Sequence, residues 1–276
     1  MPIITLTTDF GNKDHSVGAV KGAIYKELDQ ATIVDISHEI SPFHIVEAAY
    51  IIKNGYKNFP EGTIHIIGVD SELTPENNHI ALKLDNHYFI CANNGIMSLI
   101  AAEIIPEKIV QINIHDKVES NFTLLDVFVK AAAHIARGGT LDVIGKDITA
   151  IKQLIGVKPQ VNSDKKQIIG YVLYVDHYGN VVTNISRTFF EDVGKGRTFT
   201  ISTRSVQFKK IHESYSDAIN FDSPKNKREE EGKKIALFNS AGYIELAVYK
   251  SNPSTVGSAA SLFGLKYLDT VNITFD

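Results

Sequence analysis

The chain has 276 residues, of which 43% are hydrophobic and 22% charged, so it can bury a full core and is long enough for about two domains. Its formal net charge of -4 gives no electrostatic attraction toward nucleic acid or an anionic membrane surface, and we expect neither partner. Cys91 is the only cysteine, which excludes an internal disulfide and a thiolate metal cluster.

No apolar run approaches the roughly 20 residues that a membrane-spanning helix needs. The first residues lead directly into a strand pattern and carry no basic leader. With a single cysteine and no such segment, the chain is expected to be cytoplasmic.

The first predicted element is a β-branched strand over residues 3–8 that ends on Asp9. Gly11 then allows a sharp turn, and Ser16 or Asp14 is placed to cap a helix. Because ligands bind beyond the carboxyl ends of strands in open α/β sheets, Asp9, Asp14 and Ser16 are predicted to face one crevice. A carboxylate there suits a ribose diol or an amine, and the G-x-G-x-x-G pattern for a pyrophosphate is missing. The alternative is that both acids are only turn and cap residues.

Strand and helix patterns then alternate along the first half of the chain. The pattern predicts a mainly parallel, helix-covered sheet. Pro42 is expected at a helix start and Gly138 just after a helix end. The predicted strands are 32–37, 62–70, the hairpin pair 79–84 and 87–92, and 108–114, and the predicted helices are 41–59, 95–104 and 126–139.

The pattern changes after about residue 155. A polar stretch over 156–166 that contains Pro159 is typical of a linker. Short strand-like runs follow with almost no helical period, which predicts a small antiparallel barrel or sandwich. The charged run 222–234 is interpreted as a solvated hairpin loop. The predicted strands are 167–176, 180–185, 198–208, 234–240, 243–249 and 270–276.

Four stretches end in small polar residues and glycine, namely Thr7–Gly11, Ala92–Met97, Asp176–Ile185 and Asn239–Tyr243. Any one of them alone is a turn. Together, in this order, they resemble the family of S-adenosyl-L-methionine (SAM) hydroxide adenosyltransferases, also called SAM hydrolases, whose halide-using relatives are the fluorinases and chlorinases. The resemblance extends from Ile3 to about Thr274.

The resemblance implies an α/β chain with an N-terminal Rossmann-like, mainly parallel sheet domain (1–155), a linker (156–166) and a C-terminal antiparallel β-barrel domain (167–276). It also implies a homotrimer whose active sites lie between subunits. The substrate would be SAM and the products adenosine and L-methionine, with no metal or cofactor. The sulfonium of SAM is a good leaving group. Attack at the ribose 5′ carbon therefore needs a well-positioned nucleophile and an apolar site that excludes bulk water more than it needs a strong acid.

The resemblance also implies roles for particular side chains that bind substrate. Asp9 would hold the two ribose hydroxyls, since a carboxylate can accept both. Asp14, Ser16, Asp176 and Ser240 would hold the amine and carboxylate of the methionine part.

Three further positions would contact the nucleoside. Phe43 stands where an aromatic residue packs on it, Tyr178 would stack on adenine, and Asn180 would read the adenine edge through its amide. The alternative reading is that Phe43 and Tyr178 are core aromatics and Asn180 is a turn residue.

The predicted catalytic positions depart from the family pattern. The hydrolases position water with an Asp, an Arg and a His; Asp70 occupies the first position, but Asn77 replaces the Arg and Thr123 replaces the His. His79 and His65 lie near this loop in the sequence and are candidate substitutes.

Two functions remain open on this reading. The first is SAM hydrolysis by water aligned through Asp70, and the second is a SAM or adenosine binding protein with weak or lost catalysis. Halide transfer is disfavoured because Asp70 would place a negative charge beside the halide and because Ala241 stands where halogenases have Arg. Lys250 also departs from the small residue usual at the family's adenine site. An unrelated hydrolase with paired carboxylates has little support, since no second acid is placed opposite Asp9 and Asp14.

Overall fold

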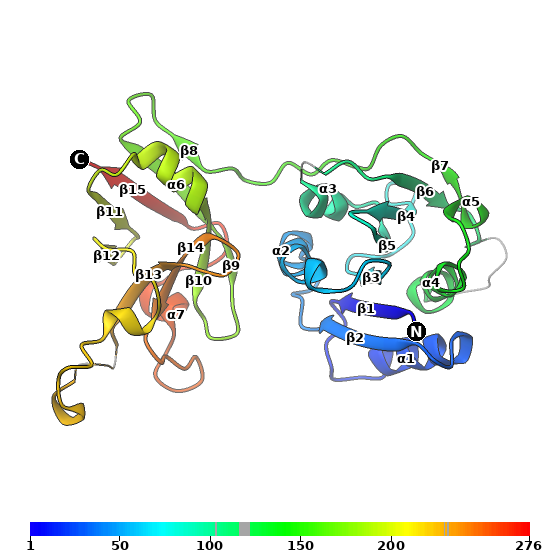
Figure 1. Cartoon of the computed structure of the whole chain (residues 1–276), viewed down its shortest axis with the longest axis horizontal. Helices are drawn as coiled ribbons and strands as arrows, with labels where there is room; N and C mark the ends of the chain where they lie inside the picture. Colours follow the sequence, from blue (N-terminus) through cyan, green and yellow to red (C-terminus); the bar gives the residue numbers. More distant parts are fainter. Residues whose placement is uncertain (103, 116–121, 229, 231) are drawn as a thin grey trace. The chain divides into compact units, whose positions relative to one another are not determined.

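The computed structural model describes residues 1–102, 104–115, 122–228, 230 and 232–276. The chain divides into two compact units, Met1–Gly156 and Val157–Asp276 (Figure 1). The first unit contains a mixed sheet, with parallel and antiparallel pairs, covered by helices, and the second contains an antiparallel, barrel-like sheet. The predicted α/β fold class is therefore confirmed.

The sheet of the first unit has the strand order β2-β1-β3-β5-β4-β6-β7. Neighbours from β2 through β5 pair in parallel, whereas β4, β6 and β7 join through antiparallel ladders. The strands are β1 (Ile3–Thr8), β2 (Thr32–Ser37), β3 (Ile64–Gly68), β4 (His79–Leu84), β5 (His87–Ala92), β6 (Lys108–Ile112) and β7 (Gly145–Asp147).

Helices cover both faces of this sheet, because alternate side chains of its strands point to opposite faces. Ile4 and Leu6 of β1 pack with α1 and α4 in one apolar cluster, and Ile67 of β3 packs with α2 and α3 in the other. The helices are α1 (Ser16–Glu27), α2 (Ile45–Gly55), α3 (Ile96–Ala101), α4 (Val129–Ala136) and α5 (Leu141–Ile144), with the short turns η1 (Tyr56–Asn58) and η3 (Leu124–Phe128, a π-helix).

The strand order reverses at β1. The chain passes from β1 through α1 to β2 on one side, and then through α2 to β3 on the other side of β1. Such a reversal separates the loops at the carboxyl ends of the two central strands and leaves room for a ligand there. Asp9 directly follows β1, and Asp70 comes two residues after β3.

Two local predictions for this unit are confirmed. The hairpin of β4 and β5 turns at Asp85 and Asn86, which both have positive φ, as a two-residue hairpin turn requires. Gly138, with φ +85°, follows the last residue of α4 and its cap. In contrast, the helix predicted from residue 41 begins only at Ile45. His44 caps it by accepting a hydrogen bond from the Glu47 N–H.

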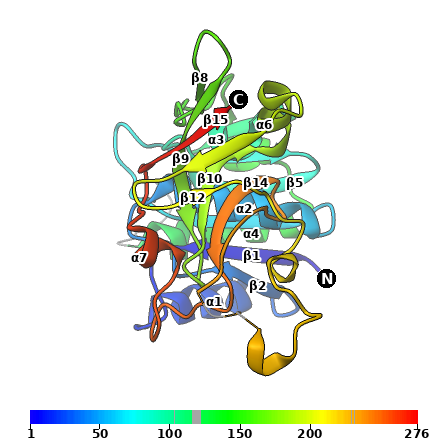
Figure 2. The same ribbon diagram turned by 90° about the vertical axis from the view of Figure 1, so that its left-hand side faces the viewer.

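The second unit is an antiparallel sheet with the order β12-β11-β15-β9-β10-β14-β13, and β8 pairs with β9 off this path. Figure 2 shows β9, β10 and β14 running side by side. The strands are β8 (Gln160–Val161), β9 (Gln167–Val175), β10 (Val181–Ser186), β11 (Phe199–Ser202), β12 (Gln207–Phe208), β13 (Lys234–Phe238), β14 (Tyr243–Val248) and β15 (Thr270–Phe275).

This sheet nearly closes on itself. His212, just beyond β12, forms a bridge to Leu237 of β13, and its N–H donates to the Ala236 carbonyl oxygen at 2.7 Å. Because β12 and β13 are the two ends of the strand order, this contact joins the sheet's edges. A continuous apolar cluster that includes Ile168 and Val181 fills the interior.

Several sequence-based predictions for this unit are wrong in detail. The run predicted as one strand over 198–208 forms β11 and β12, with a turn between them. The expectation of almost no helical structure here fails at α6 (Arg187–Gly194) and α7 (Ala259–Phe263), two short helices that the strand-like runs around them concealed. Short η4 (Ser216–Ala218) and η5 (Lys225–Lys227) turns complete the unit.

Candidate functional site

Asp9 joins the loops that follow β1, β2 and β3. Its carboxylate oxygen Oδ2 accepts the Phe43 backbone N–H at 2.9 Å and, more weakly, the Asp70 backbone N–H at 3.5 Å. Within the described residues, the other oxygen, Oδ1, has no hydrogen-bond partner. One carboxylate therefore fixes two loops at the switch point and keeps an oxygen that can accept from a ligand.

Asp70 has an unusual backbone conformation that its surroundings impose. Its φ is +45°, in the left-handed region that few residues other than glycine adopt. The Asn94 side-chain amide donates to the Asp70 carbonyl oxygen at 3.1 Å, and the Asp9 carboxylate lies at its N–H. His79 donates to the carbonyl oxygen of the next residue, Ser71, at 2.9 Å. Backbone strain held by several partners is common where a side chain must be aimed at a ligand.

Phe43 lies on the surface. Its φ is +62°, and 72% of the residue is exposed. The hydrogen bond from its N–H to Asp9 holds the backbone in this strained conformation. The alternative reading of Phe43 as a core aromatic is wrong, and its ring is available to a ligand or a partner surface.

Asn77 lies in a tight turn after Asp70. Thr74 and Asn77 exchange backbone hydrogen bonds, and the Thr74 hydroxyl accepts the Asn77 N–H at 3.0 Å. The Asn77 Oδ1 atom accepts a hydrogen bond of 3.1 Å from the Lys152 ammonium. The sequence-based reading missed Lys152, since it lies outside every motif considered.

Thr123 lies at the start of η3, over the carboxyl ends of β1 and β3. On one side Phe122 packs against Phe10, with ring centroids 5.4 Å apart. On the other side Leu124 covers Gly68, where an added Cβ would lie 2.2 Å from the Leu124 side chain. These two contacts fix the backbone around Thr123 at the sheet edge where Asp9 and Asp70 lie.

Asp14 and Ser16 begin the loop-to-helix transition into α1. The Asp14 carboxylate accepts the Ser16 N–H at 3.2 Å, and this bond lowers the pKa of Asp14. His15, whose side chain makes no capping bond, holds the N-cap position. Asp14 thus keeps a turn role and is also exposed to solvent as an anion.

His79 and His65, the candidate substitutes for the family's His, lie inside the packed sheet and not on its surface. Both are buried, and burial lowers the pKa of His79 to about 4 and that of His65 to about 3. His79 bonds Ser71 and His115, whereas His65 bonds the Thr5 hydroxyl and His87. Both rings are neutral near pH 7 and serve the packing of the sheet.

In the second unit, Asp176, Tyr178 and Asn180 form the turn between β9 and β10. The Asp176 carboxylate accepts the Asn180 N–H at 2.7 Å and the Asn180 side-chain amide at 3.0 Å. Gly179, with φ +74°, packs so closely on Ser258 that an added Cβ would lie 2.2 Å from that residue's Cβ. The turn is rigid, and Tyr178 at its tip is 65% exposed, so it is not a core aromatic.

Ser240 lies exposed in the turn between β13 and β14. The Asn239 side-chain oxygen shapes this turn by accepting the Ala241 and Tyr243 N–H groups, each at 3.1 Å. The amide nitrogen of Asn239 donates a hydrogen bond to the Glu245 carboxylate at 3.3 Å.

Glu245 is a buried acid that the sequence-based reading missed. The Tyr215 hydroxyl donates to it, and burial, with a smaller effect from the charge of Asp176, raises the pKa of Glu245. The signal in the sequence is one acid inside the otherwise apolar run of β14. Glu245 thus links the turn that carries Ser240 with the neighbourhood of Asp176.

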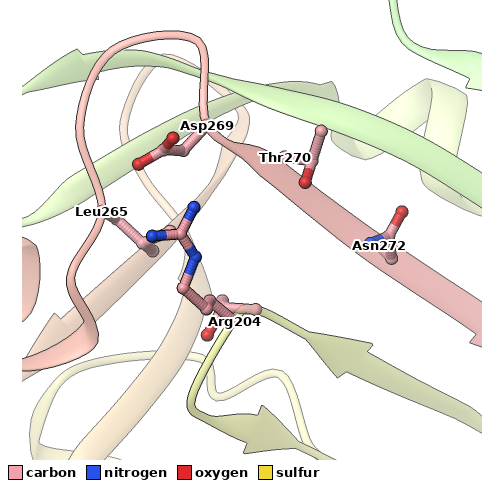
Figure 3. A pocket seen from close by; sticks show the side chains of 6 residues that line it. Arg204, Leu265, Asp269, Thr270 and Asn272 are labelled. Atoms are coloured by element: carbon pink, nitrogen blue, oxygen red, sulfur yellow. The ribbon is translucent and has the colours of Figure 1, made fainter.

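A separate cavity of about 240 Å³ lies beside β15 and contains none of the predicted site residues (Figure 3). Its volume is below the roughly 300–1,000 Å³ typical of small-molecule sites. Thr203, Arg204, Leu265, Asp269, Thr270 and Asn272 line it.

Among the described residues, no group of three or more His, Cys, Asp or Glu side chains is placed to hold a metal ion. In the part of the chain that the structure covers, no helix combines the length and apolar composition needed to cross a membrane.

Comparisons with known proteins show similarity over most or all of the chain. The (R)-S-adenosyl-L-methionine hydrolase of Methanocaldococcus jannaschii is 29% identical, and the alignment covers 100% of this chain and 97% of that protein. A fluorinase of Nocardia brasiliensis is 25% identical over 89% of this chain and 90% of its own. A crystal structure of an uncharacterised conserved protein from Thermotoga maritima matches with a TM-score of 0.82 and 27% identity, covering 99% of each chain.

Two family models match the chain. The SAM hydroxide adenosyltransferase N-terminal domain matches residues 4–145, and the C-terminal domain of the same family matches residues 170–272. Together the two matches cover most of both units, including every predicted site residue. The chain therefore belongs to the SAM hydroxide adenosyltransferase family.

Proposed function

We propose that the protein hydrolyses SAM to adenosine and L-methionine. Water or hydroxide attacks the ribose 5′ carbon, a C–O bond forms, and the C–S bond breaks with its electron pair going to the methionine sulfur. The proton of the attacking water goes to Asp70 or to solvent. No redox partner or metal is needed, since the sulfonium is itself a good leaving group.

The observation that carries this proposal is the arrangement of Asp9 and Asp70. The Asp9 carboxylate accepts the backbone N–H groups of Phe43 and Asp70, so one group ties the proposed ribose site to the proposed water site. In this proposal Oδ1 of Asp9 accepts hydrogen bonds from the ribose hydroxyls, and the exposed ring of Phe43 packs on the nucleoside. Preset geometry of this kind lowers the barrier without reorganisation during reaction.

The C-terminal unit contributes the remaining contacts in this proposal. Tyr178 stacks on adenine, and Asp176 and Ser240 hold the methionine amine and carboxylate together with Asp14 and Ser16. The amide nitrogen of Asn180 donates one of its two N–H bonds to Asp176, which leaves the second N–H and the amide oxygen for the adenine edge.

Assembly is part of the proposal. We expect a homotrimer in which the second unit of one subunit completes the site formed by the first unit of its neighbour. Mixed trimers of Asp9→Asn and Asp176→Asn subunits would then regain activity that neither variant has alone. If the sites do not cross subunits, mixing restores nothing.

A second candidate is a SAM or adenosine binding protein with little turnover. It is favoured by one feature, the neutral side chains Asn77 and Thr123 at the positions where the family resemblance places Arg and His. Such a protein would retain Asp9, Phe43 and their hydrogen bond.

The test is direct incubation of purified protein with SAM, followed by chromatography for adenosine and methionine. The names of several relatives specify the (R) form, so both sulfonium epimers are assayed separately. Asp70→Asn is the matched control. Equal adenosine from wild type and Asp70→Asn would exclude the proposed mechanism, and ligand binding without any adenosine would favour the binding protein.

A further inference from the structure

We propose that Lys152 is a positioning residue for the hydrolysis, acting through Asn77. The proposal rests on the proposed function and names a residue at a site that lacks the family's Arg. The Lys152 ammonium lies 3.1 Å from Asn77 Oδ1, although the two residues are 75 positions apart in the chain. Lys152 also lies outside both ranges that match the family models.

The segment that carries Lys152 is fixed by the same motif that fixes Asp70. The Asn93 side-chain oxygen accepts the Lys152 backbone N–H at 2.8 Å. The adjacent Asn94 donates its amide to the Asp70 carbonyl oxygen at 3.1 Å. Two consecutive side chains at the end of β5 therefore hold the backbones of Lys152 and Asp70, which gives both a common rigid support.

The Asn93 backbone extends this support to Asn77. Its N–H donates to the carbonyl oxygen of Asn78 at 2.6 Å. The turn that carries Asn77 is therefore bonded to the motif at its C-terminal side, while Thr74 closes it internally. The turn that carries Asn77 and the segment that carries Lys152 meet because Asn93 is bonded both to Asn78 and to Lys152.

The contact with Lys152 determines which way the Asn77 amide faces. An ammonium group only donates hydrogen bonds, so it must meet the amide oxygen of Asn77. The two N–H bonds of the Asn77 amide then point away from Lys152, and no acceptor among the described residues takes them. The positive charge of Lys152 beside the amide oxygen also draws electron density from the amide nitrogen, which makes its N–H bonds stronger hydrogen-bond donors.

Lys152 and Asn77 together therefore supply what a single Arg would supply, namely N–H donors supported by a positive charge. In this arrangement the Asn77 amide donates to the attacking water or hydroxide and stabilises the developing hydroxide character. Lys152 contacts neither substrate nor water. Loss of Lys152 should thus lower kcat and leave KM nearly unchanged.

The test is a double-mutant cycle of Lys152→Met and Asn77→Ala, scored by kcat and KM for SAM. We expect Lys152→Met to lower kcat about tenfold, because the charge acts through one intervening amide. Lys152→Arg should restore most of the rate, and Lys146→Met, a change at another exposed lysine of the same unit, should have no effect. In the Asn77→Ala background, Lys152→Met should change kcat less than twofold.

Two outcomes overturn the inference while the proposed function stands. One is an active wild type whose kcat is unchanged by Lys152→Met, and the other is an equal loss in both backgrounds. A turnover-independent readout is the side-chain amide NMR signal of Asn77, identified by its loss in Asn77→Ala. It should shift in Lys152→Met and stay in place in Lys146→Met, and an unmoved signal also rejects the inference.

A wild type that releases no adenosine gives a different result. It overturns the proposed function and, with it, the catalytic role of Lys152. The NMR signal then decides separately whether Lys152 orients the Asn77 amide.

Discussion

The Phe43 backbone N–H donates a 2.9 Å hydrogen bond to the Asp9 carboxylate across 34 positions of sequence. This bond holds Phe43 at a positive φ with its ring exposed, and it occupies one carboxylate oxygen while leaving the other open. The loop after β2 and the end of β1 therefore behave as one structural unit at the strand switch point.

The role of Asp9 is tested by separating its charge from its shape. Asp9→Asn keeps an oxygen for the Phe43 N–H, so the melting temperature without ligand should stay near the wild-type value. The stabilisation by adenosine or SAM should fall markedly, since the ribose hydroxyls lose a charged acceptor. Asp9→Ala should lower stability by roughly 1 kcal/mol or more, because two backbone donors lose their acceptor. Thermal shift measurements on Asp9→Asn and Asp9→Ala, with and without ligand, check these two expectations, and Asp29→Ala is the surface control. If Asp9→Asn is stabilised by the ligand as much as wild type, the ribose assignment is rejected.

Asp70 combines a strained backbone with a proposed catalytic side chain. Asp70→Asn tolerates the left-handed conformation and should fold normally while losing on the order of 100-fold in adenosine formation. Asp70→Gly removes the strain and should be as stable as wild type or more stable, yet equally inactive. Urea unfolding and adenosine release are measured in parallel. Retained activity in Asp70→Gly would show that the carboxylate is not needed.

Stability should depend on pH through the buried histidines. The pKa of His79 is lowered to about 4 and that of His65 to about 3, whereas an unfolded histidine titrates near 6.5. Between these values the unfolded state binds more protons, so the stabilising contribution is complete above pH 6.5 and is lost as pH falls toward 4 and 3. We expect the unfolding free energy to fall by on the order of 3 kcal/mol per histidine across this window. Urea titrations at a series of pH values from 7 to 4 measure the unfolding free energy. The His79→Gln variant should show a smaller fall of this free energy with decreasing pH.

Gly179 and Gly196 form a matched pair for the turn that carries Tyr178. Both have positive φ, +74° and +78°, but an added Cβ at Gly179 would collide with Ser258, whereas open space surrounds Gly196. Gly196→Ala should cost about 1–2 kcal/mol from backbone strain alone. Gly179→Ala should cost more and should also weaken adenosine binding, as measured by calorimetry. Equal effects of the two changes would mean that the Ser258 contact does not shape the turn.

The departures at Asn77 and Thr123 are tested by restoring the family residues. Asn77→Arg with Thr123→His should raise kcat more than the product of the single changes, because grouped catalytic side chains act as a unit. Asn77→Arg alone places a guanidinium beside the Lys152 ammonium, and this repulsion should limit its gain. Steady-state kinetics of the four proteins measure the coupling. Additive single effects would show that the two positions work independently.

The sequence determined the fold class and the approximate position of most strands. The apolar run of β1 and the acid that follows it predicted that Asp9 lies at the carboxyl edge of a sheet, and the family resemblance assigned Asp70 to the proposed water site. The hairpin of β4 and β5 and the position of Gly138 after α4 were also predicted, since a short hairpin connection and a helix end depend on local residue type.

Local patterns did not reveal α6, α7 or the break between β11 and β12. Each segment is shorter than the window over which a helical or strand period can be counted. The Ser186 side chain caps α6, and Phe189 and Phe190 pack on the core of the second unit, so a cap and tertiary contacts stabilise this two-turn helix.

The tertiary structure alone decided which polar groups meet. It placed Phe43 outside the core, buried His79 in a hydrogen bond with His115, and brought Lys152 to Asn77. These contacts join residues from distant parts of the chain, and their geometry depends on how the loops are anchored at the end of the sheet. No residue spacing encodes that geometry, because it arises only when the strands have paired in register and the side chains of Asp9, Asn93 and Asn94 have bonded the loops together.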